Sequence, residues 1–236
     1  MSKSHETSSP AGPVNQTFGM ASPSLFDLLP DDERRALLST ARRRRFHRHD
    51  TIFHEGDPGD ALHVIVDGLV AIRVTTTMGD VVTLTVHGPG ESFGELAAIG
   101  EVTARTASAV AATDVETLSI IRMDLDELRR RHPRVERFIV DLLAQHVVRL
   151  NAQLLEALYV PVEKRVLRRL LALRDACGSE DGVALPFTQE DVASMAGTTR
   201  PTANRVLIRL RDDGLIELGR GRITVLDRAA LERLAR

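Results

Sequence analysis

Residues 188–211 read TQEDVASMAGTTRPTANRVLIRLR, and this stretch decides the fold of the C-terminal part of the chain. Thr188 suits the N-cap of a helix, and the acidic residues that follow it at 190 and 191 suit the positive end of the helix dipole. Gly197 permits a turn. Pro201 is tolerated in the first turn of a second helix, because its missing N–H would have no acceptor there. The stretch therefore predicts a helix-turn-helix.

The second of these helices is strongly basic. It contains four arginines, at positions 200, 205, 209 and 211, and no acidic residue. Thr198 or Thr199 can cap it, and the apolar residues at 206, 207 and 210 form the face that packs inward, as do those at 192, 193 and 196 in the first helix. Such a helix can enter the major groove of DNA. The alternative is a pair of basic amphipathic helices with a solvated face.

A hairpin pattern follows the two helices. The apolar segments 215–218 and 223–226 flank Gly-Arg-Gly-Arg at 219–222, which predicts two short strands joined by a basic turn. Two helices followed by such a hairpin are the pattern of a winged helix-turn-helix. The hairpin therefore favours the DNA-binding interpretation over the solvated helix pair.

Composition limits the classes of protein that fit. The chain has 236 residues, enough for two modest domains, and a hydrophobic fraction of 43% that supports a substantial core. The net charge is −2, so any affinity for nucleic acid must be local; residues 161–236 hold 14 Lys and Arg against 11 Asp and Glu. The single cysteine, Cys177, permits no internal disulfide. No apolar run reaches the ~18–20 residues of a membrane span and no signal-peptide core is visible, so we expect a cytoplasmic protein.

The N-terminal half changes pattern twice. Residues 1–22 are rich in Ser, Thr, Pro and Gly and predict a disordered tail, whereas 24–41 have the apolar spacing of a helix with a good start at Pro30. From 50 to 122, short apolar runs rich in β-branched residues alternate with glycines, which predicts an antiparallel sandwich or barrel. For the four arginines at 42–45 we expect a solvated basic rim leading into a strand, with a second nucleic-acid site as the alternative.

A long helix is predicted after the β-rich part. One set of its apolar residues is spaced like the seam of a coiled coil: Val140, Leu143, Val147, Leu150, Leu154 and Ala157. A second stripe can cover the β-rich part: Phe138, Ile139, Leu142 and Leu155. One helix cannot bury both stripes against one small domain, so we expect a parallel homodimer rather than a wholly intramolecular helix. The helix should end just before Pro161, which makes this point a hinge, and a further helix is expected over 162–176.

The β-rich part, the long helix, the hinge and the winged helix-turn-helix follow one another in the order typical of the CRP/FNR family of bacterial transcription regulators. The chain resembles this family over about residues 24–230, and the matching motif residues stand at the family's spacing: Gly56, Gly68, Gly79, Gly94, Glu95, Leu96, Arg105, Thr106, Arg200 and Arg205. The resemblance implies an α+β fold. Its parts would be an N-terminal cyclic-nucleotide-binding β-roll of jelly-roll type (23–133), a dimerisation helix and hinge (134–160) and a C-terminal winged helix-turn-helix domain (161–236).

The resemblance assigns the contacts of a cyclic nucleotide to one segment of the β-rich part, and the residues there suit that chemistry. Arg105 can bind the single phosphate charge with a two-pronged fork, and Thr106 adds a hydroxyl donor. Glu95 can accept a hydrogen bond from the ribose 2′-hydroxyl, and the backbone at Gly94 and Leu96 can donate at the start of a short helical turn. The alternative is that Glu95 and Arg105 form only an ion pair at the rim of the barrel.

Leu150 and Asn151 depart from the family, whose cyclic-AMP-binding members contact the adenine through two adjacent hydroxyl residues of the long helix. Leu150 cannot hydrogen-bond a base, whereas the amide of Asn151 can donate and accept. Cyclic AMP is therefore the first choice of effector, and cyclic GMP, another ligand or a site without nucleotide are left open. No metal is expected: an iron–sulfur cluster would need several cysteines, and the scattered histidines do not indicate a haem ligand.

The resemblance also assigns the DNA contacts: Thr188, Gln189, Thr199, Arg200, Pro201, Thr202, Asn204, Arg205 and Arg209. Arg200, Pro201 and Arg205 stand where the family touches base edges, and each arginine can pair with O6 and N7 of guanine. Pro201 replaces an acidic residue there; it offers only apolar contact, or it merely stiffens the start of the helix. Arg209 and Arg211 are expected to contact phosphates. A two-fold dimer would read an inverted repeat in double-stranded DNA, and RNA polymerase is a candidate further partner.

Three classes of function can be compared with the sequence. A transcription regulator gated by a cyclic nucleotide accounts for both halves of the chain and for the dimer seam. A DNA-binding regulator with a different effector, or with none, is the second interpretation. A cyclic-nucleotide-controlled enzyme or kinase regulatory subunit is the third, but no catalytic cluster, phosphate-cradling loop or metal-ligand spacing supports an enzyme.

Overall fold

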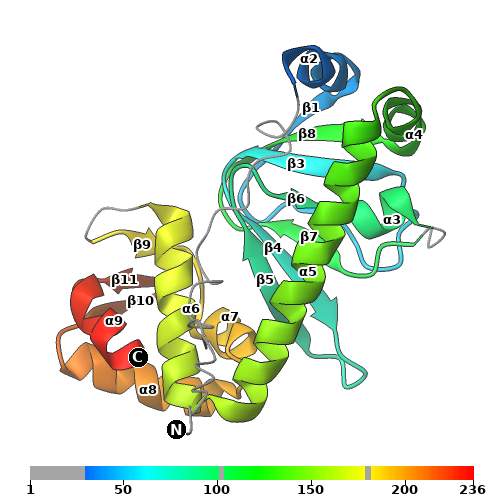
Figure 1. Ribbon diagram of the computed structural model, residues 1–236. Coiled ribbons are helices and arrows are strands. Elements are labelled where there is room, and N and C mark those ends of the chain that lie inside the picture. The colour runs from blue at the N-terminus through cyan, green and yellow to red at the C-terminus, as the bar shows by residue number, and fades with distance from the viewer. Residues whose placement is uncertain (1–29, 101–103, 179–181) are drawn as a thin grey trace, which may run out of the picture.

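The computed structural model describes residues 30–100, 104–178 and 182–236 (Figure 1). A β-sandwich with short helices forms one end of the molecule, and a smaller, mainly helical unit with a three-stranded sheet forms the other. The long helix α5 (Pro133–Tyr159) runs from the first part to the second. The tail predicted for 1–22 lies outside the described residues. Over the described ranges, no helix combines the length and the apolar character needed to cross a membrane.

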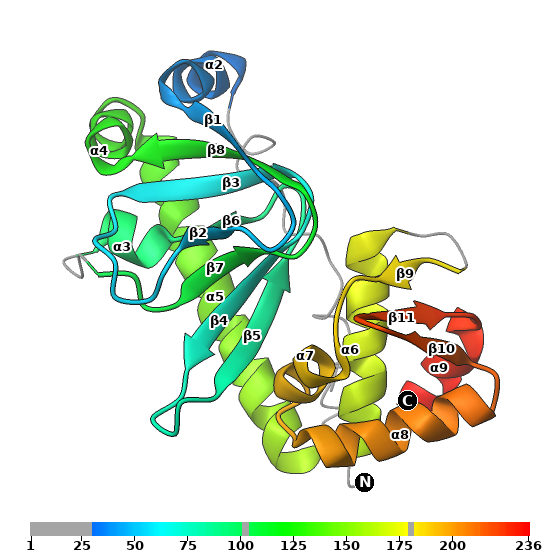
Figure 2. The same ribbon diagram turned by 180° about the vertical axis from the view of Figure 1, so that it is seen from behind.

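Two four-stranded antiparallel sheets form the sandwich (Figure 2). The strand order of the first sheet is β1 (Arg42–Phe46), β8 (Val115–Ile121), β3 (Ala61–Asp67) and β6 (Ser92–Phe93). The order of the second is β2 (Thr51–Phe53), β7 (Ser108–Ala111), β4 (Val70–Thr75) and β5 (Val81–His87). Both sheets contribute to one apolar cluster, whose buried members are Ile65, Val70, Phe93, Ala109, Ala111 and Val115. The predicted antiparallel sandwich is confirmed.

The four arginines at 42–45 form the strand β1 itself, whereas the sequence pattern predicted a rim that precedes a strand. All four are exposed, and β1 is the edge of its sheet, paired with β8 alone among the described strands. Glu116 of β8 forms ion pairs with two of them, Arg43 and Arg45, and its Oε2 lies 2.8 Å from Arg45 Nε. Charged side chains on an edge strand discourage pairing with another chain. The four arginines therefore protect the edge of the sheet. The sequence did not predict this strand, because it lacks the alternation of apolar and polar residues that marks other strands.

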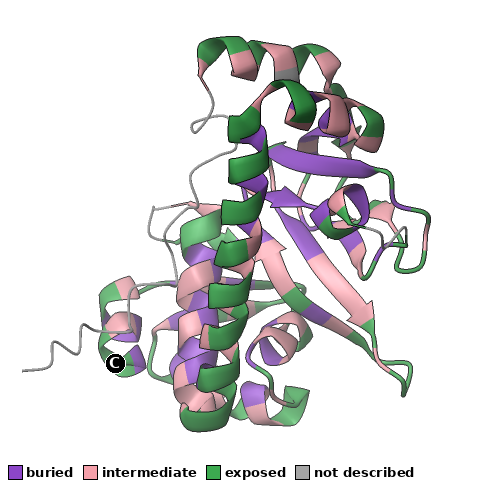
Figure 3. Cartoon of the chain, turned by 45° about the vertical axis from the view of Figure 1, so that its right-hand side comes forward, coloured by how far each residue is buried: buried purple, intermediate pink, exposed green. Residues whose placement is uncertain are grey.

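The first sheet is covered by the helices α2 (Asp31–Thr40), α3 (Glu95–Ile99), α4 (Arg122–Arg131) and the first half of α5. Phe138, Ile139 and Leu142 of α5 are buried in this layer, as predicted. Exposed residues occur along the whole length of α5 (Figure 3). Leu155 was predicted to join the buried residues, but it is 52% exposed, because a helical repeat of about 3.6 residues places it about 220° around the helix from Leu142.

The opposite part of the α5 surface is apolar and open to solvent. We call Val140, Leu143, Val147, Leu150, Leu154 and Ala157 the α5 seam. Four of them are more than half exposed, namely Val140, Val147, Leu150 and Leu154, and Leu143 is partly buried against the helical layer. Contiguous apolar surface of this kind is uncommon on a monomer and marks an interaction site.

The break between the long helix and the next one lies where the sequence predicted it. α5 ends at Tyr159 and α6 (Val162–Cys177) begins directly after Pro161. Glu156, near the end of α5, is only 4% exposed and forms ion pairs with Arg168, at 3.3 Å, and Arg169, both on α6. This buried carboxylate joins the end of α5 to two guanidinium groups of α6 and so stabilises the angle between the two helices.

The C-terminal unit consists of α6, β9 (Ala184–Leu185), α7 (Gln189–Met195), α8 (Arg200–Asp212), β10 (Ile216–Gly219), β11 (Arg222–Val225) and α9 (Arg228–Ala235). Its antiparallel sheet has the order β10, β11, β9. The hairpin of β10 and β11 is the wing that the sequence predicted. The winged helix-turn-helix is therefore confirmed.

Local signals fix the helix-turn-helix. Thr188 caps α7: its Oγ1 accepts from the backbone N–H of Asp191 at 3.1 Å, and the carboxylate of Asp191 accepts from the backbone N–H of Thr188 at 2.9 Å. Gly197 turns with φ of 59°, and Pro201 stands in the first turn of α8. Leu207 and Leu210 are buried as predicted, whereas Val206 is only half-buried, since Ala203 takes the deeper position one turn earlier.

Two turn glycines of the sandwich allow a matched stability test. Gly68 and Gly79 have φ of +85° and +89°; a Cβ on Gly68 would lie 2.1 Å from the carbonyl oxygen of Asp114, whereas one on Gly79 would meet nothing within 4 Å. We expect Gly79→Ala to lower the free energy of unfolding by about 1–2 kcal/mol, the strain of a left-handed alanine. Gly68→Ala should cost at least about 3 kcal/mol, because the backbone must also shift. Chemical denaturation measures both; equal losses would contradict the packing at Gly68.

Candidate functional site

A cavity of about 250 Å³ lies between the sandwich and α5. Its walls come from β4 and β5, from the α3 turn, from the segment 105–107 and from one face of α5. The structure brings together six of the seven residues predicted to hold a cyclic nucleotide: Gly94, Glu95, Leu96, Arg105, Thr106 and Leu150. The seventh, Asn151, is exposed and does not line the cavity of its own chain.

Arg105 is a buried cation in the wall of this cavity. Its guanidinium carbon lies 4.1 Å from the centre of the Phe53 ring, and its Nη1 donates to the carbonyl of Gly94 at 2.9 Å. Burial lowers the pKa of Arg105, although the carboxylates of Asp60, Glu95 and Asp57 oppose this shift. Its Nε is buried without a hydrogen-bond partner among the described residues. The guanidinium has five N–H donors, and among the described residues one hydrogen bond is seen, from Nη1 to Gly94, so the side chain keeps donor capacity for an anion.

The glycine at 94 makes room for this guanidinium. A Cβ at that position would lie 2.5 Å from Arg105 Nη1, and the backbone φ of +78° is one that only glycine adopts without strain. Gly94 also precedes α3, so the chain bends sharply at the point where Glu95 and Leu96 enter the cavity wall.

Glu95 is the buried anion of the site. It is 6% exposed, and its Oε1 lies 3.3 Å from Nδ1 of His146 on α5. Burial alone would raise its pKa, but the hydrogen bond and charge of His146 hold the pKa below its ordinary value. Glu95 is therefore ionised at neutral pH. Within the described part of the chain it is paired with His146 and not directly with Arg105, so the ion-pair alternative is not what the geometry shows.

Sequence reasoning did not assign the other eleven residues that line the cavity, among them Phe53, His146, Arg149 and Gln153. The three on α5 follow one another at steps of three and four, so they share a helix face with Leu150 and could have been found by extending the pattern from it. Arg149 is held by Glu91, whose Oε1 lies 3.5 Å from Arg149 Nη1. No local signal marks Phe53, which reaches Arg105 only through the pairing of distant strands.

The predicted DNA-contact residues lie at the start of α7 and along α8. Six are exposed: Thr188, Thr199, Arg200, Pro201, Arg205 and Arg209; the other three, Gln189, Thr202 and Asn204, are half-buried. Two of the arginines have acidic neighbours within the unit. Arg200 Nε lies 3.8 Å from Glu190 Oε2, and Arg209 pairs with Glu163 of α6. Both arginine side chains are more than half exposed, so water screens the two pairs and a phosphate can displace them.

Comparison with known families gives a match for each half of the chain. The cyclic nucleotide-binding domain matches residues 43–132, and the Crp-like helix-turn-helix domain matches residues 164–234. With the cavity in the first half and the winged helix-turn-helix in the second, these matches define a DNA-binding transcription regulator with a cyclic-nucleotide-binding domain. It is not an enzyme.

Individual relatives specify the family. The chain is 35% identical over 212 residues to the cyclic AMP receptor protein of Thermus thermophilus, covering 89% of this chain and 96% of that protein. It is 35% identical over 198 residues to the CRP-like cAMP-activated global transcriptional regulator of Mycobacterium tuberculosis, covering 81% and 87%. The crystal structure of the Thermus thermophilus catabolite activator protein shares 34% identity over 89% of this chain and 97% of that one, with a TM-score of 0.52. The chain belongs to the CRP/FNR family.

Proposed function

We propose that the cavity beside α5 binds a cyclic nucleotide, with cyclic AMP as the first candidate, and that binding controls the DNA affinity of the winged helix-turn-helix. One observation carries the proposal: the buried guanidinium of Arg105 lines the cavity and retains donor capacity, while Glu95 offers a carboxylate in the same wall. A cyclic nucleotide needs a cation for one phosphate charge and an acceptor for one hydroxyl. The two side chains match these two needs.

The remaining cavity residues are proposed to contact the phosphate, the ribose and the base. Thr106 and the backbone of Gly94 and Leu96 are proposed to complete the phosphate and ribose contacts. The base would then lie between apolar side chains of the sandwich and Leu150 of α5. Asn151 is not part of the lining of its own cavity, so its proposed contact with the base requires the cavity of a second copy.

A regulator with another effector is the second candidate. Leu150 favours it, because the cavity then lacks one hydrogen-bonding group that would read the base. A protein described as c-di-GMP-responsive, CLP of Xanthomonas campestris, shares this fold with a TM-score of 0.68 at 24% identity over 84% of this chain. Calorimetric titration with cyclic AMP and cyclic GMP separates the two candidates, since no heat with either nucleotide would favour the second.

Arg105→Lys and Arg105→Ala test the ligand site. Both variants remove the two-pronged fork, and alanine also removes the charge, so we expect affinity for cyclic AMP to fall by about two orders of magnitude or more for alanine and by less for lysine. Isothermal calorimetry measures the affinity, and a thermal melt checks that each variant is folded. Unchanged affinity in a folded alanine variant would refute the assignment of Arg105.

We also propose that two copies pair along the α5 seam as a parallel homodimer. Val147 of the seam and Val148, the next residue around the helix, are both more than half exposed in the single chain, which makes them a matched pair. Val147→Asp should convert the dimer into a monomer, because a charge would be buried in the seam. Val148→Asp should leave the dimer intact. Sedimentation analysis distinguishes the two, and dissociation by both variants or by neither would contradict the seam.

The proposed homodimer places two copies of α8 on an inverted repeat, with RNA polymerase as a candidate partner and the cytoplasm as the place of action. The proposed units remain 23–133, 134–160 and 161–236. They separate the effector site, the dimer contact and the DNA contact along the chain.

Pro201 leads to a specific expectation for the DNA sequence. We expect Arg200 and Arg205 to retain guanine preferences worth roughly 1–3 kcal/mol each, whereas the base pair that an acidic residue would read becomes relaxed or changes. Arg209 should act on phosphates, so Arg209→Gln should weaken binding to all sequences alike and flatten the salt dependence. Selection from a random DNA pool checks the preferences. Undiminished preference at the Pro201 position would refute its role, and recovery of no inverted repeat would refute the dimeric arrangement.

A further inference from the structure

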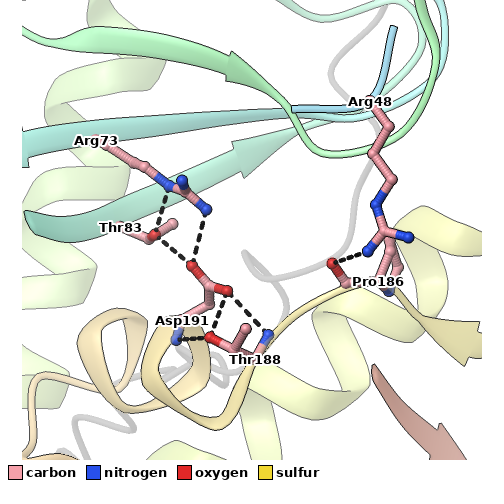
Figure 4. A network of polar contacts seen from close by, with 6 residues as sticks. All are labelled: Arg48, Arg73, Thr83, Pro186, Thr188 and Asp191. Atoms are coloured by element: carbon pink, nitrogen blue, oxygen red, sulfur yellow. Dashed lines mark hydrogen bonds and ion pairs between the residues drawn. The ribbon is translucent and has the colours of Figure 1, made fainter. Parts of the chain in front are cut away.

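The helix-turn-helix is docked against the sandwich through a polar cluster (Figure 4). Asp191 of α7 receives two donors from the sandwich at one carboxylate oxygen: Arg73 Nη2 at 3.1 Å and Thr83 Oγ1 at 2.8 Å. Arg73 Nε also donates to Thr83 Oγ1 at 3.3 Å. The other oxygen of Asp191 accepts from the backbone and hydroxyl of Thr188, at 2.9 and 2.7 Å. We call Arg73, Thr83 and Asp191 the interdomain cluster.

The cluster is largely shielded from water. Thr83 is 2% exposed, and the side chains of Arg73 and Asp191 are 30% and 12% exposed. Burial alone would raise the pKa of Asp191, but the donors of Thr188 and Thr83 and the charge of Arg73 hold the pKa below its ordinary value. Asp191 is therefore an anion at neutral pH, and loss of Arg73 would leave a partly buried carboxylate short of its cation.

Apolar and backbone contacts accompany the cluster. Leu69, Ala71 and Ala112 of the sandwich belong to the same buried apolar cluster as the core of the C-terminal unit. Arg48 Nη2 donates to the carbonyl of Pro186, just before α7, at 3.4 Å. The two parts are thus packed together over a continuous surface.

The strands that carry the interdomain cluster also form a wall of the effector cavity. Ile72 and Leu84 line the cavity, and they are next in sequence to Arg73 and Thr83. Thr85, which follows Leu84, lines the cavity as well. The pairing of β4 with β5 shifts register between Ile72 and Arg73, so Ile72 pairs with Thr85 and Arg73 pairs with Thr83, and Leu84 has no partner in this described ladder. Such a bulge re-aims neighbouring side chains, so a ligand against Leu84 acts on the strand segment that carries Arg73 and Thr83.

We infer that Arg73 and Thr83 are positioning residues that hold the C-terminal unit in a docked state with low DNA affinity. The inference rests on the proposed function and adds the contact through which it is exerted. Docking places β5 and Arg73 against the start of α7, and the proposed DNA contacts of Thr188 and Gln189 belong to that same helix start.

The docked state would determine the apparent affinity for DNA. If only the undocked fraction binds DNA, the apparent dissociation constant equals the intrinsic constant divided by that fraction. Weakening the docked state therefore raises DNA affinity in the absence of effector, and has little effect once the effector has already released the contact. By linkage, it also raises the affinity for the effector.

Arg73→Met and Thr83→Val test this without touching the helix-turn-helix, whereas a change of Asp191 would also remove the cap of α7. Neither Arg73 nor Thr83 lines the described cavity. Arg42→Met is the matched control, because it removes the same charge from an exposed position of the same sandwich, away from α7. DNA affinity of the full chain is measured by fluorescence anisotropy on the inverted repeat obtained by selection, with and without saturating cyclic AMP, after a thermal melt has shown each variant to be folded.

We expect Arg73→Met to raise effector-free DNA affinity by at least about fivefold, the lower end of typical allosteric coupling, and Thr83→Val to raise it by less. Affinity at saturating cyclic AMP should stay within about twofold of wild type, and Arg42→Met should change neither. Unchanged or weaker effector-free binding in Arg73→Met, or an equal rise with and without cyclic AMP, would overturn the inference. If the wild type binds no cyclic nucleotide, the proposed effector is wrong, and the effector-free comparison alone decides whether docking limits DNA binding.

Discussion

Helix α5 makes three different contacts, and its repeat of about 3.6 residues per turn determines which residues face each of them. One face buries Phe138 and Ile139 against the sandwich, a neighbouring face gives His146 and Arg149 to the cavity, and the seam, which meets the cavity at Leu150, is mostly exposed. The helix is a single rod of 27 residues, so these contacts are not independent. A ligand that shifts the cavity face of α5 acts on the same rod that carries the seam and ends at the hinge.

Two of the polar contacts that attach the C-terminal unit to the rest of the molecule differ in their exposure to water. At the hinge, Glu156 is 4% exposed and forms ion pairs with two arginines of α6. In the interdomain cluster, Arg73 keeps 30% of its side chain exposed, so water can replace Asp191 as its partner at lower cost. We infer from this difference that the hinge contact is kept and that the interdomain cluster is the contact that is released.

Local rules explain what the sequence could predict. The cap of α7, the turn at Gly197 and the break before Pro161 depend on residues close in sequence, and all three predictions were correct. The strand of arginines depends on pairing with the distant strand β8, which no short pattern records, whereas the exposure of Leu155 follows from its position around the helix. In the site, Arg105 and Glu95 were identified from motif spacing. Their partners Phe53 and His146 were not, because they come from a distant strand and from α5.

The interdomain cluster is a further feature that could not be predicted from the sequence. Arg73, Thr83 and Asp191 lie on three separate elements, and each has an ordinary local explanation in the sequence: an exposed strand cation, a strand threonine and a helix cap. Their juxtaposition joins strands that line the cavity to the first helix of the helix-turn-helix. This contact arises from tertiary structure alone.

On the proposed function, a ligand in the cavity changes the environment of α7. Hydrogen exchange of the backbone amides, measured with and without cyclic AMP, reports on both places. We expect slower exchange at 94–98 and 105–107, where the nucleotide would bind, together with faster exchange at the start of α7 and in β5, where docking is released. Slower exchange confined to the cavity, with α7 and β5 unchanged, would contradict it.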